Sequence, residues 1–254
     1  MTQDINDDRI TPLSYVTGAY MDYQRKYADN PRESDKKLLA LIEETAPDTL
    51  ARAGSRILDI GCSNGNFLRY LHRRHPSLSC CGADLFSEII EDNIRNPELQ
   101  GINFFVGDVR KLESINGLDV VVANAVLSRF SDAEFEASIA SLSRTLKPGG
   151  HLFCFEWVHP YEQMLAIREF SLEQPQGLTL HLRPYSNYSS VLKGNGFADI
   201  RFDPFEIPVD LPVPASNADL ATHTVRTETG KRLNFRGALY QPWCHVVARK
   251  RADA

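Results

Sequence analysis

An alternation of strand-like and helix-like segments between residues 56 and 158 constrains the fold of this chain more than any other feature. The run GLDVVVANAVL at 117–127 is apolar almost throughout, which is typical of a strand that is covered on both faces. The helical pattern after it opens with Ser131 and Glu134 in the spacing of a capping box. Short strands that alternate with amphipathic helices predict a doubly wound α/β fold, with a mostly parallel sheet and helices on both faces.

The segments outside this stretch set the expected domain organisation. Strand patterns at 198–207 and 241–250 raise the expected sheet to seven strands. Residues 1–50 carry helical patterns with a helix-start signal between them, which predicts an N-terminal helical cap. Residues 51–254 are then expected to form one Rossmann-like domain around the sheet.

The last hundred residues are less regular than the rest. The segment YEQMLAIREFS at 161–171 and the segment at 185–197 both predict helices. The stretch of about 208–240 separates the last two sheet strands, and its sequence alternates around Thr229 and Gly230. This pattern predicts an insertion that contains a β-hairpin near the C-terminus.

The segment ILDIGCSNGNF at 57–67 places its smallest side chains directly behind a predicted strand. Ligands of open parallel sheets bind at the carboxyl ends of the strands, so exposed backbone here predicts close approach of a ligand. A dinucleotide loop requires glycine at its first, third and sixth positions, where this chain has Gly61, Ser63 and Asn66. The Gly-Lys-Ser/Thr element of a Walker loop is absent as well. The loop therefore disfavours a nicotinamide dehydrogenase and a nucleotide phosphate site, while a simple tight turn stays open as an alternative.

The motif from Asp59 to Gly65 resembles the first motif of class I S-adenosylmethionine-dependent methyltransferases, with Ser63 in place of the middle glycine. The resemblance covers about residues 15–200 and implies S-adenosyl-L-methionine as cofactor and S-adenosyl-L-homocysteine as product. It implies that Asp84 binds the ribose hydroxyls and that Asp108 meets the adenine amino group. The alternative for either acid is a purely structural role as a helix cap. The residues that it implies for cofactor binding are Asp59, Gly61, Cys62, Ser63, Gly65, Asp84, Leu85, Asp108, Val109, Asn124 and Ala125, with Tyr20 and Tyr27 from the cap.

Methyl transfer from a sulfonium is an in-line displacement with a neutral leaving group, so placing the nucleophile and excluding water matter most. A general base is needed only when the acceptor arrives protonated. His159 and Glu156 follow the fifth predicted strand and are the candidate catalytic residues; a histidine bonded to backbone and a loop cap are the alternatives. Arg129 stands after the fourth strand, where many family members carry a His pair. Candidates for the same pocket, with core packing as the alternative, are His181, Arg183, Tyr185 and Tyr188.

The composition of the chain limits the kinds of partner that we expect it to bind. The formal net charge of −5 provides no general attraction to nucleic acid, and no apolar run approaches the roughly 20 residues of a membrane span. The five cysteines form no metal-site spacing, and the acidic, polar start is unlike a signal peptide, so we expect no metal and a cytoplasmic location.

The sequence thus predicts a methyltransferase that acts on an O or N atom of a small molecule or peptide. We expect it to act as a monomer or homodimer. The alternatives are a protein methyltransferase and a fold relative that binds S-adenosylmethionine without catalysis.

Overall fold

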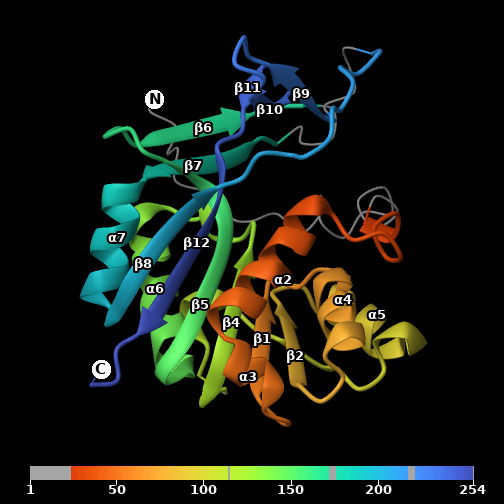
Figure 1. The fold of residues 1–254 in the computed structure, drawn as a ribbon, viewed down its shortest axis with the longest axis vertical. Helices are drawn as coiled ribbons and strands as arrows, with labels where there is room; N and C mark the ends of the chain where they lie inside the picture. The colour runs from red at the N-terminus through yellow and green to blue at the C-terminus, as the bar shows by residue number, and fades with distance from the viewer. Residues whose placement is uncertain (1–23, 114, 172–175, 217–220, 254) are drawn as a thin grey trace, which may run out of the picture.

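A twisted central sheet runs through the molecule, with helices packed against both of its faces (Figure 1). The computed structural model describes residues 24–113, 115–171, 176–216 and 221–253. Seven strands follow one another across the sheet in the order β3-β2-β1-β4-β5-β12-β8. Their bounds are β1 (Arg56–Ile60), β2 (Ser79–Asp84), β3 (Asn103–Val106), β4 (Leu118–Asn124), β5 (Leu146–His159), β8 (Phe197–Pro204) and β12 (Trp243–Lys250).

The direction of the strands confirms the prediction of a mostly parallel sheet. The strands from β3 to β5 pair in parallel, and β12 pairs antiparallel with both β5 and β8. The chain moves from β1 outward to β2 and β3, then returns to place β4 on the other side of β1. This reversal creates a switch point beyond the carboxyl ends of β1 and β4, where ligands of α/β sheets bind.

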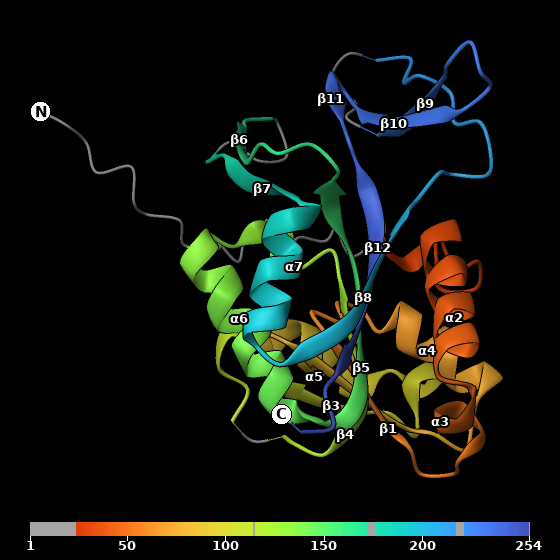
Figure 2. The ribbon, with the colours of Figure 1, turned by 60° about the vertical axis from the view of Figure 1, so that its left-hand side comes forward.

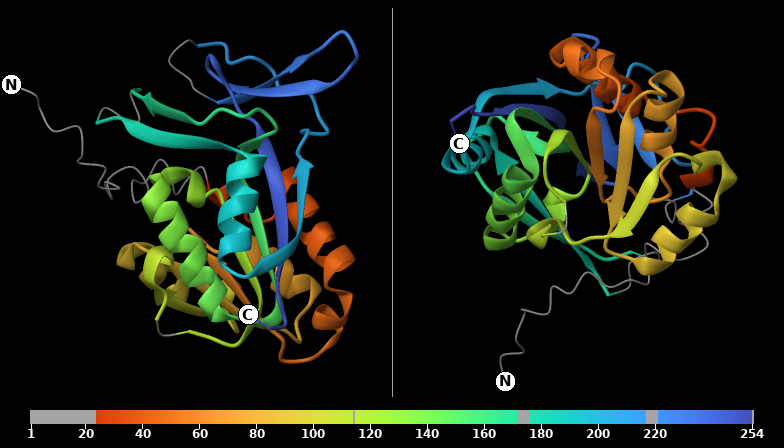
Figure 3. Two further views of the ribbon diagram at one scale, coloured as in Figure 1. Left: turned by 90° about the vertical axis from the view of Figure 1, so that its left-hand side faces the viewer. Right: turned by 90° about the horizontal axis from the view of Figure 1, so that it is seen from below.

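The described helices form two layers that the sheet separates (Figures 2 and 3). Each layer buries a hydrophobic cluster against one face of the sheet, which is why the central strands are apolar on both sides. The capping box predicted at Ser131 and Glu134 is present at the start of α6. The helices are α2 (Glu33–Thr45), α3 (Pro47–Ala51), α4 (Asn66–Arg74) and α5 (Ser87–Arg95) on one side, and α6 (Asp132–Thr145) and α7 (Tyr185–Gly194) on the other.

The helix predicted at 161–171 is wrong. This segment contains strand β6 (Leu165–Glu169), which pairs antiparallel with β7 (Leu178–Pro184), and β7 in turn joins the end of β5. Alternate residues of β7 pack with Trp157 in a small hydrophobic cluster, which fixes β7 in place. Strand β6 forms by pairing with β7, and the sequence of 161–171 alone does not reveal this partner. Within the residues that the structure describes, the sheet therefore has nine strands, two more than expected.

The insertion before the last strand forms a separate antiparallel sheet of three short strands, in the order β11-β10-β9. The strands are β9 (Thr222–Arg226), β10 (Arg232–Arg236) and β11 (Leu239–Tyr240), and the hairpin predicted around Thr229 and Gly230 joins β9 to β10. This small sheet and the β6–β7 pair lie beyond the carboxyl ends of the parallel strands (Figure 1). The predicted domain boundary after residue 50 stays a prediction.

Candidate cofactor and acceptor site

A cavity of about 590 Å³ opens at the carboxyl ends of the parallel strands, at the switch point between β1 and β4. Its lining comes from strand ends, from the segment before α2 and from the insertion. Gly65 does not line it, and Tyr20 lies outside the described residues. The cavity lining includes these residues that the sequence predicted for cofactor binding: Asp59, Gly61, Cys62, Ser63, Asp84, Leu85, Asp108, Val109, Asn124, Ala125 and Tyr27.

The glycines of the loop after β1 have two different physical roles. Gly61 has φ of +72°, and a Cβ there would collide with Cγ2 of Val126 from the loop after β4. Gly65 also has φ of +72°, but a Cβ there would meet Leu99 Cδ1 at 3.0 Å, on the packed side of the loop. Gly61 therefore lets two loops meet at the cavity, whereas Gly65 lets the start of α4 pack closely.

Asp84 at the end of β2 holds the glycine loop in place. Its Oδ2 accepts the backbone N–H of Ser63 at 3.0 Å, and its Oδ1 accepts the N–H of Phe86 at 3.2 Å. Burial raises the pKa of Asp84, and the amide hydrogen bonds oppose that shift. A carboxylate has about four lone-pair sites, so these amide contacts still leave hydrogen-bonding capacity toward the cavity.

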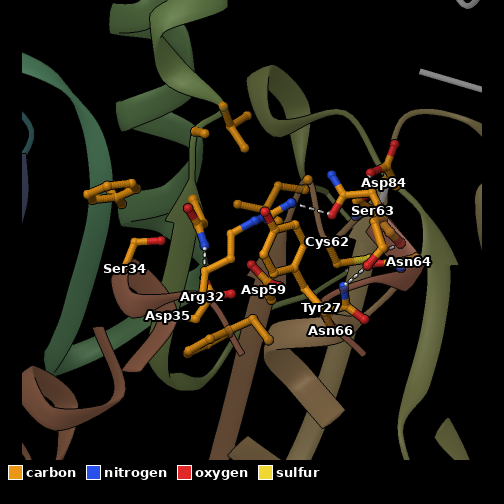
Figure 4. Close-up of a pocket in the computed structure, with 18 of the residues that line it drawn as sticks. Tyr27, Arg32, Ser34, Asp35, Asp59, Cys62, Ser63, Asn64, Asn66 and Asp84 are labelled. Carbon is orange, nitrogen blue, oxygen red and sulfur yellow. Dashed lines mark hydrogen bonds between the residues drawn. The ribbon is translucent and has the colours of Figure 1, made fainter. Parts of the chain in front are cut away.

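Two further carboxylates, Asp59 and Asp35, line the cavity, and Figure 4 shows Asp59 between Asp35 and Asp84. Asp59 is 2 % exposed, and its Oδ1 has no hydrogen-bond partner among the described residues. Burial raises the pKa of Asp59, and the negative charges of Asp35 and Asp84 raise it further. Asp35, in the first turn of α2, has its pKa raised by burial and accepts a hydrogen bond of 2.9 Å from Asn124 Nδ2. Clustered acids of this kind suit a cationic ligand.

Asp35 is a lining residue that the sequence analysis missed. It lies 89 positions from Asn124 along the chain, so no local motif connects the two side chains. An acid in the first turn of a helix is common because it complements the helix dipole, and that signal points to no ligand by itself.

The segment before α2 is fixed over the glycine loop by residues of α4. Asn66 Nδ2 donates to the backbone carbonyl of Gln24 at 2.8 Å, and Arg69 forms an ion pair with Asp29. Arg32 donates to the side chain of Gln24 at 2.8 Å and lies 4.2 Å above the ring of Tyr27. Asn66, which breaks the dinucleotide pattern, thus anchors the segment that carries Tyr27 at the cavity (Figure 4).

Asp108 combines the two roles that the sequence left open. It lines the cavity, and it also caps the short 3-10 helix Val109–Lys111 by accepting the N–H of Arg110 at 2.9 Å. The Arg110 guanidinium pairs with the same carboxylate at 2.8 Å. Burial acts to raise the pKa of Asp108, but the hydrogen bonds and charge of Arg110 outweigh it, so the pKa lies below its usual value.

The two candidate catalytic residues do not line the cavity within the described part of the chain. Glu156 is buried and accepts backbone N–H groups of the loop after β4, which matches the alternative of a loop cap. His159 is buried at the end of β5, and burial lowers its pKa. Their positions therefore provide no support for direct contact with reacting atoms.

The four pocket candidates at 181–188 are likewise absent from the described lining. Arg183 is fully buried, where it donates to the carbonyl of Phe130 at 2.6 Å and pairs with Asp132. Tyr188 packs against Phe135 with 4.6 Å between ring centroids. Tyr185 stacks on Phe202 of β8 with 4.3 Å between ring centroids, so Arg183, Tyr185 and Tyr188 pack within the fold, in agreement with the alternative of core packing.

Comparison with known proteins agrees with this geometry. Residues 57–150 match the family described as "Methyltransferase domain". The ubiquinone/menaquinone biosynthesis C-methyltransferase UbiE of Desulfotalea psychrophila is 24% identical over 180 residues, which cover 61% of this chain and 72% of that protein. The trans-aconitate 2-methyltransferase of Methylobacterium nodulans is 31% identical over 127 residues, which cover 50% of this chain but only 45% of the relative.

Solved structures show the same fold. An amino pentose methyltransferase from Micromonospora echinaspora, solved with S-adenosylmethionine bound, superposes with a TM-score of 0.55 and 16% identity, covering 92% of this chain and 97% of that one. A methyltransferase from Methanosarcina mazei gives a TM-score of 0.55 and 20% identity, covering 82% and 97%.

The domain match over residues 57–150, the relatives and the sheet order support the class that the sequence predicted, a class I S-adenosylmethionine-dependent methyltransferase. S-adenosylmethionine is the cofactor of this enzyme class, and the acid-lined end of the cavity is compatible with such a cation. The described helices include none that is both long and apolar enough to cross a membrane. The relatives methylate different kinds of atom, since their names include C-, N- and O-methyltransferases.

Proposed function

We propose that this protein transfers a methyl group from S-adenosylmethionine to an O or N atom of a small molecule. The observation that supports the proposal is the division of one cavity into two chemically different ends. One end is lined by the buried acids Asp35, Asp59 and Asp84. The other end is apolar, and its lining includes Phe155, Phe205, Ile207 and Trp243.

The acidic end has the donors and acceptors that the cofactor requires. Asp84 would accept hydrogen bonds from the two ribose hydroxyls through its remaining lone pairs. Asp59 and Asp35 would face the α-ammonium group of the cofactor's amino-acid part, where the Asp59 Oδ1 has no described partner of its own. Asp108 would lie near the adenine, with its carboxylate kept ionised by Arg110. These assignments rest on the lining and on the chemistry of the side chains.

The apolar end would favour the reaction by excluding water. When bound, S-adenosylmethionine supplies an electrophilic methyl group on a sulfonium. The aromatic wall around Phe155 and Trp243 would hold the acceptor against that methyl and keep solvent away from it. No general base has a role in this proposal, which suits an acceptor that reacts as an anion or a free amine.

Calorimetric titration with S-adenosylmethionine tests the cofactor part of the proposal. Asp84→Asn should bind the cofactor about 5- to 150-fold more weakly than wild type, because a charge-assisted hydrogen-bond partner worth about 1–3 kcal/mol is lost. Asp92→Asn is the matched control, since this carboxylate is 61% exposed on α5. Unchanged binding by Asp84→Asn would remove this residue from the site, and absence of binding by the wild type would refute the proposal.

The proposal extends to a cytoplasmic enzyme that acts as a monomer or homodimer and does not require nucleic acid or a membrane. A peptide acceptor is the closest competing substrate. Transfer of a labelled methyl group from S-adenosylmethionine to small-molecule acceptors, measured with formation of S-adenosylhomocysteine, tests the reaction itself.

A further inference from the structure

The connection between β8 and β9 contains a segment outside helices and strands, residues 205–211, which bends at Pro208 and Val209 and which we term the strap. It has the sequence FEIPVDL, in which apolar side chains occupy every second position. The four odd-numbered residues all line the cavity, namely Phe205, Ile207, Val209 and Leu211.

The even-numbered positions face a different environment. Asp210 pairs with Arg226 of β9 at 2.7 Å and with Arg232 of β10 at 2.8 Å. Glu206 accepts the backbone N–H of Arg232 at 3.1 Å. The strap thus presents apolar side chains to the cavity and carboxylates to the hairpin.

Main-chain hydrogen bonds add to this attachment. Leu211 donates its N–H to Thr224 Oγ1 at 2.9 Å, and the Thr224 N–H donates to the Leu211 carbonyl at 3.1 Å. Asn234 Nδ2 reaches the carbonyl of Phe205 at 3.3 Å. Pro208 has no N–H and the backbone bends at Pro208 and Val209, which disfavours a further sheet strand here. The hairpin therefore acts as a frame that holds the strap at the cavity.

The cavity wall contributed by β5 and β12 is also apolar. Phe155 stacks on Trp243 with ring centroids 4.5 Å apart and an interplanar angle of 8°. Phe155 also meets Phe205 of the strap edge to face, at 5.3 Å. Among the polar residues that line the cavity, Arg236 forms an ion pair with Glu169 of β6, so a carboxylate of this chain already balances its charge.

We infer that the methyl acceptor carries an uncharged, apolar carbon body that packs against the strap, and that the strap side chains determine acceptor specificity. This inference rests on the proposed function, because it concerns the acceptor end of the same cavity. Burial of apolar surface contributes about 25 cal/mol per Å² of favourable free energy, so a hydrocarbon or ring system would bind well against this wall. A polyhydroxylated or zwitterionic body would lose hydration against the apolar strap side chains.

A charge placed on the strap tests the inference directly. Val209 lines the cavity and is 48% exposed, so Val209→Asp should fold. Val213, four residues along the same connection, is 66% exposed and absent from the described lining, so Val213→Asp is the matched control. The probe is the uncharged dye N-phenyl-1-naphthylamine, titrated by fluorescence in the presence of saturating S-adenosylhomocysteine. Val209→Asp should weaken dye binding at least fivefold, and Val213→Asp should stay within twofold of wild type.

Acceptor pairs with the same nucleophile but different bodies give a second measurement. Decanoic acid is compared with gluconic acid, and 1-naphthylamine with glucosamine, using labelled S-adenosylmethionine. The apolar member of a pair should be methylated preferentially, with a kcat/KM that Val209→Asp lowers and Val213→Asp does not.

The inference is overturned if the polar members are preferred, if the wild type binds no dye, or if both variants bind the dye equally well. If none of the four compounds is methylated, dye binding alone decides the inference. Cofactor titration separates these outcomes from failure of the proposed function, because both strap variants should bind S-adenosylmethionine as the wild type does.

Discussion

Glu156 at the end of β5 holds the loop that follows β4. Its Oε1 accepts the backbone N–H groups of Val126 at 2.7 Å and Leu127 at 2.6 Å, and its Oε2 accepts that of Ser128 at 3.0 Å. The residue is 1% exposed, and burial raises its pKa against the opposing effect of these amides. Val126 lines the cavity, so the carboxylate shapes the site through the backbone.

Replacing Glu156 with glutamine keeps the shape of the side chain and removes one acceptor. If the amide oxygen stays with Val126 and Leu127, the amide nitrogen faces the Ser128 N–H, and a buried donor then lacks a partner at a cost of about 1–3 kcal/mol. The two remaining hydrogen bonds lose their charge assistance, which is worth about 1 kcal/mol each. Release from the cost of burying a carboxylate offsets part of this loss. We expect Glu156→Gln to lower the free energy of unfolding by about 2–4 kcal/mol.

Urea unfolding measures this loss, with Glu136→Gln on the exposed side of α6 as a control that should stay within about 0.5 kcal/mol of wild type. The same preparations are assayed for methyl transfer. Stability of Glu156→Gln within 0.5 kcal/mol of wild type, together with a large loss of turnover, would refute the structural role. That result would favour the sequence prediction that Glu156 is a catalytic residue.

Two predictions concern pH. Burial, with the charges of Asp35 and Asp84, raises the pKa of Asp59; affinity for S-adenosylmethionine should therefore fall as the pH drops through that raised pKa. Asp59→Asn should flatten this dependence in calorimetric titrations between pH 5 and 8, and equal slopes for the two proteins would contradict the assignment. Burial lowers the pKa of His245 to about 4, so the unfolded chain takes up the proton first as the pH falls. The contribution of His245 to the free energy of unfolding should therefore drop by about 2 kcal/mol between pH 7 and pH 5. Urea unfolding at pH 7 and pH 5 measures this difference, and His245→Gln should lose about 2 kcal/mol less stability than wild type between the two pH values. The same loss in the variant and in the wild type would contradict the role of His245.

Residues close together in sequence allowed much of the cavity to be predicted. Asp59 and Gly61 belong to one strand-loop motif, and Asp84 ends the next strand, so a parallel sheet places all three at the same edge. Asn66 was used only to exclude a dinucleotide loop, although its side chain holds the N-terminal segment. Its role depends on Gln24, a residue 42 positions away.

Contacts between distant segments account for the places where the structure departs from the sequence predictions. The segment at 161–171 has a pattern that suits a helix when read alone, and pairing with β7 makes part of it a strand. Glu156 stood next to the predicted site in sequence, but its carboxylate meets amides contributed by the loop after β4. His159 ends the same strand and does not join the described lining either.

Local patterns in the sequence determined the parallel sheet, the glycine loop and the acids at the strand ends, because hydrophobic periodicity and backbone freedom act over a few residues. The tertiary structure alone decided that Asp35 joins those acids, that Glu156 supports a loop, and that the strap closes an apolar wall. Each of these depends on packing between segments far apart in the chain, and its free energy comes from burial and hydrogen bonds that no single segment can form.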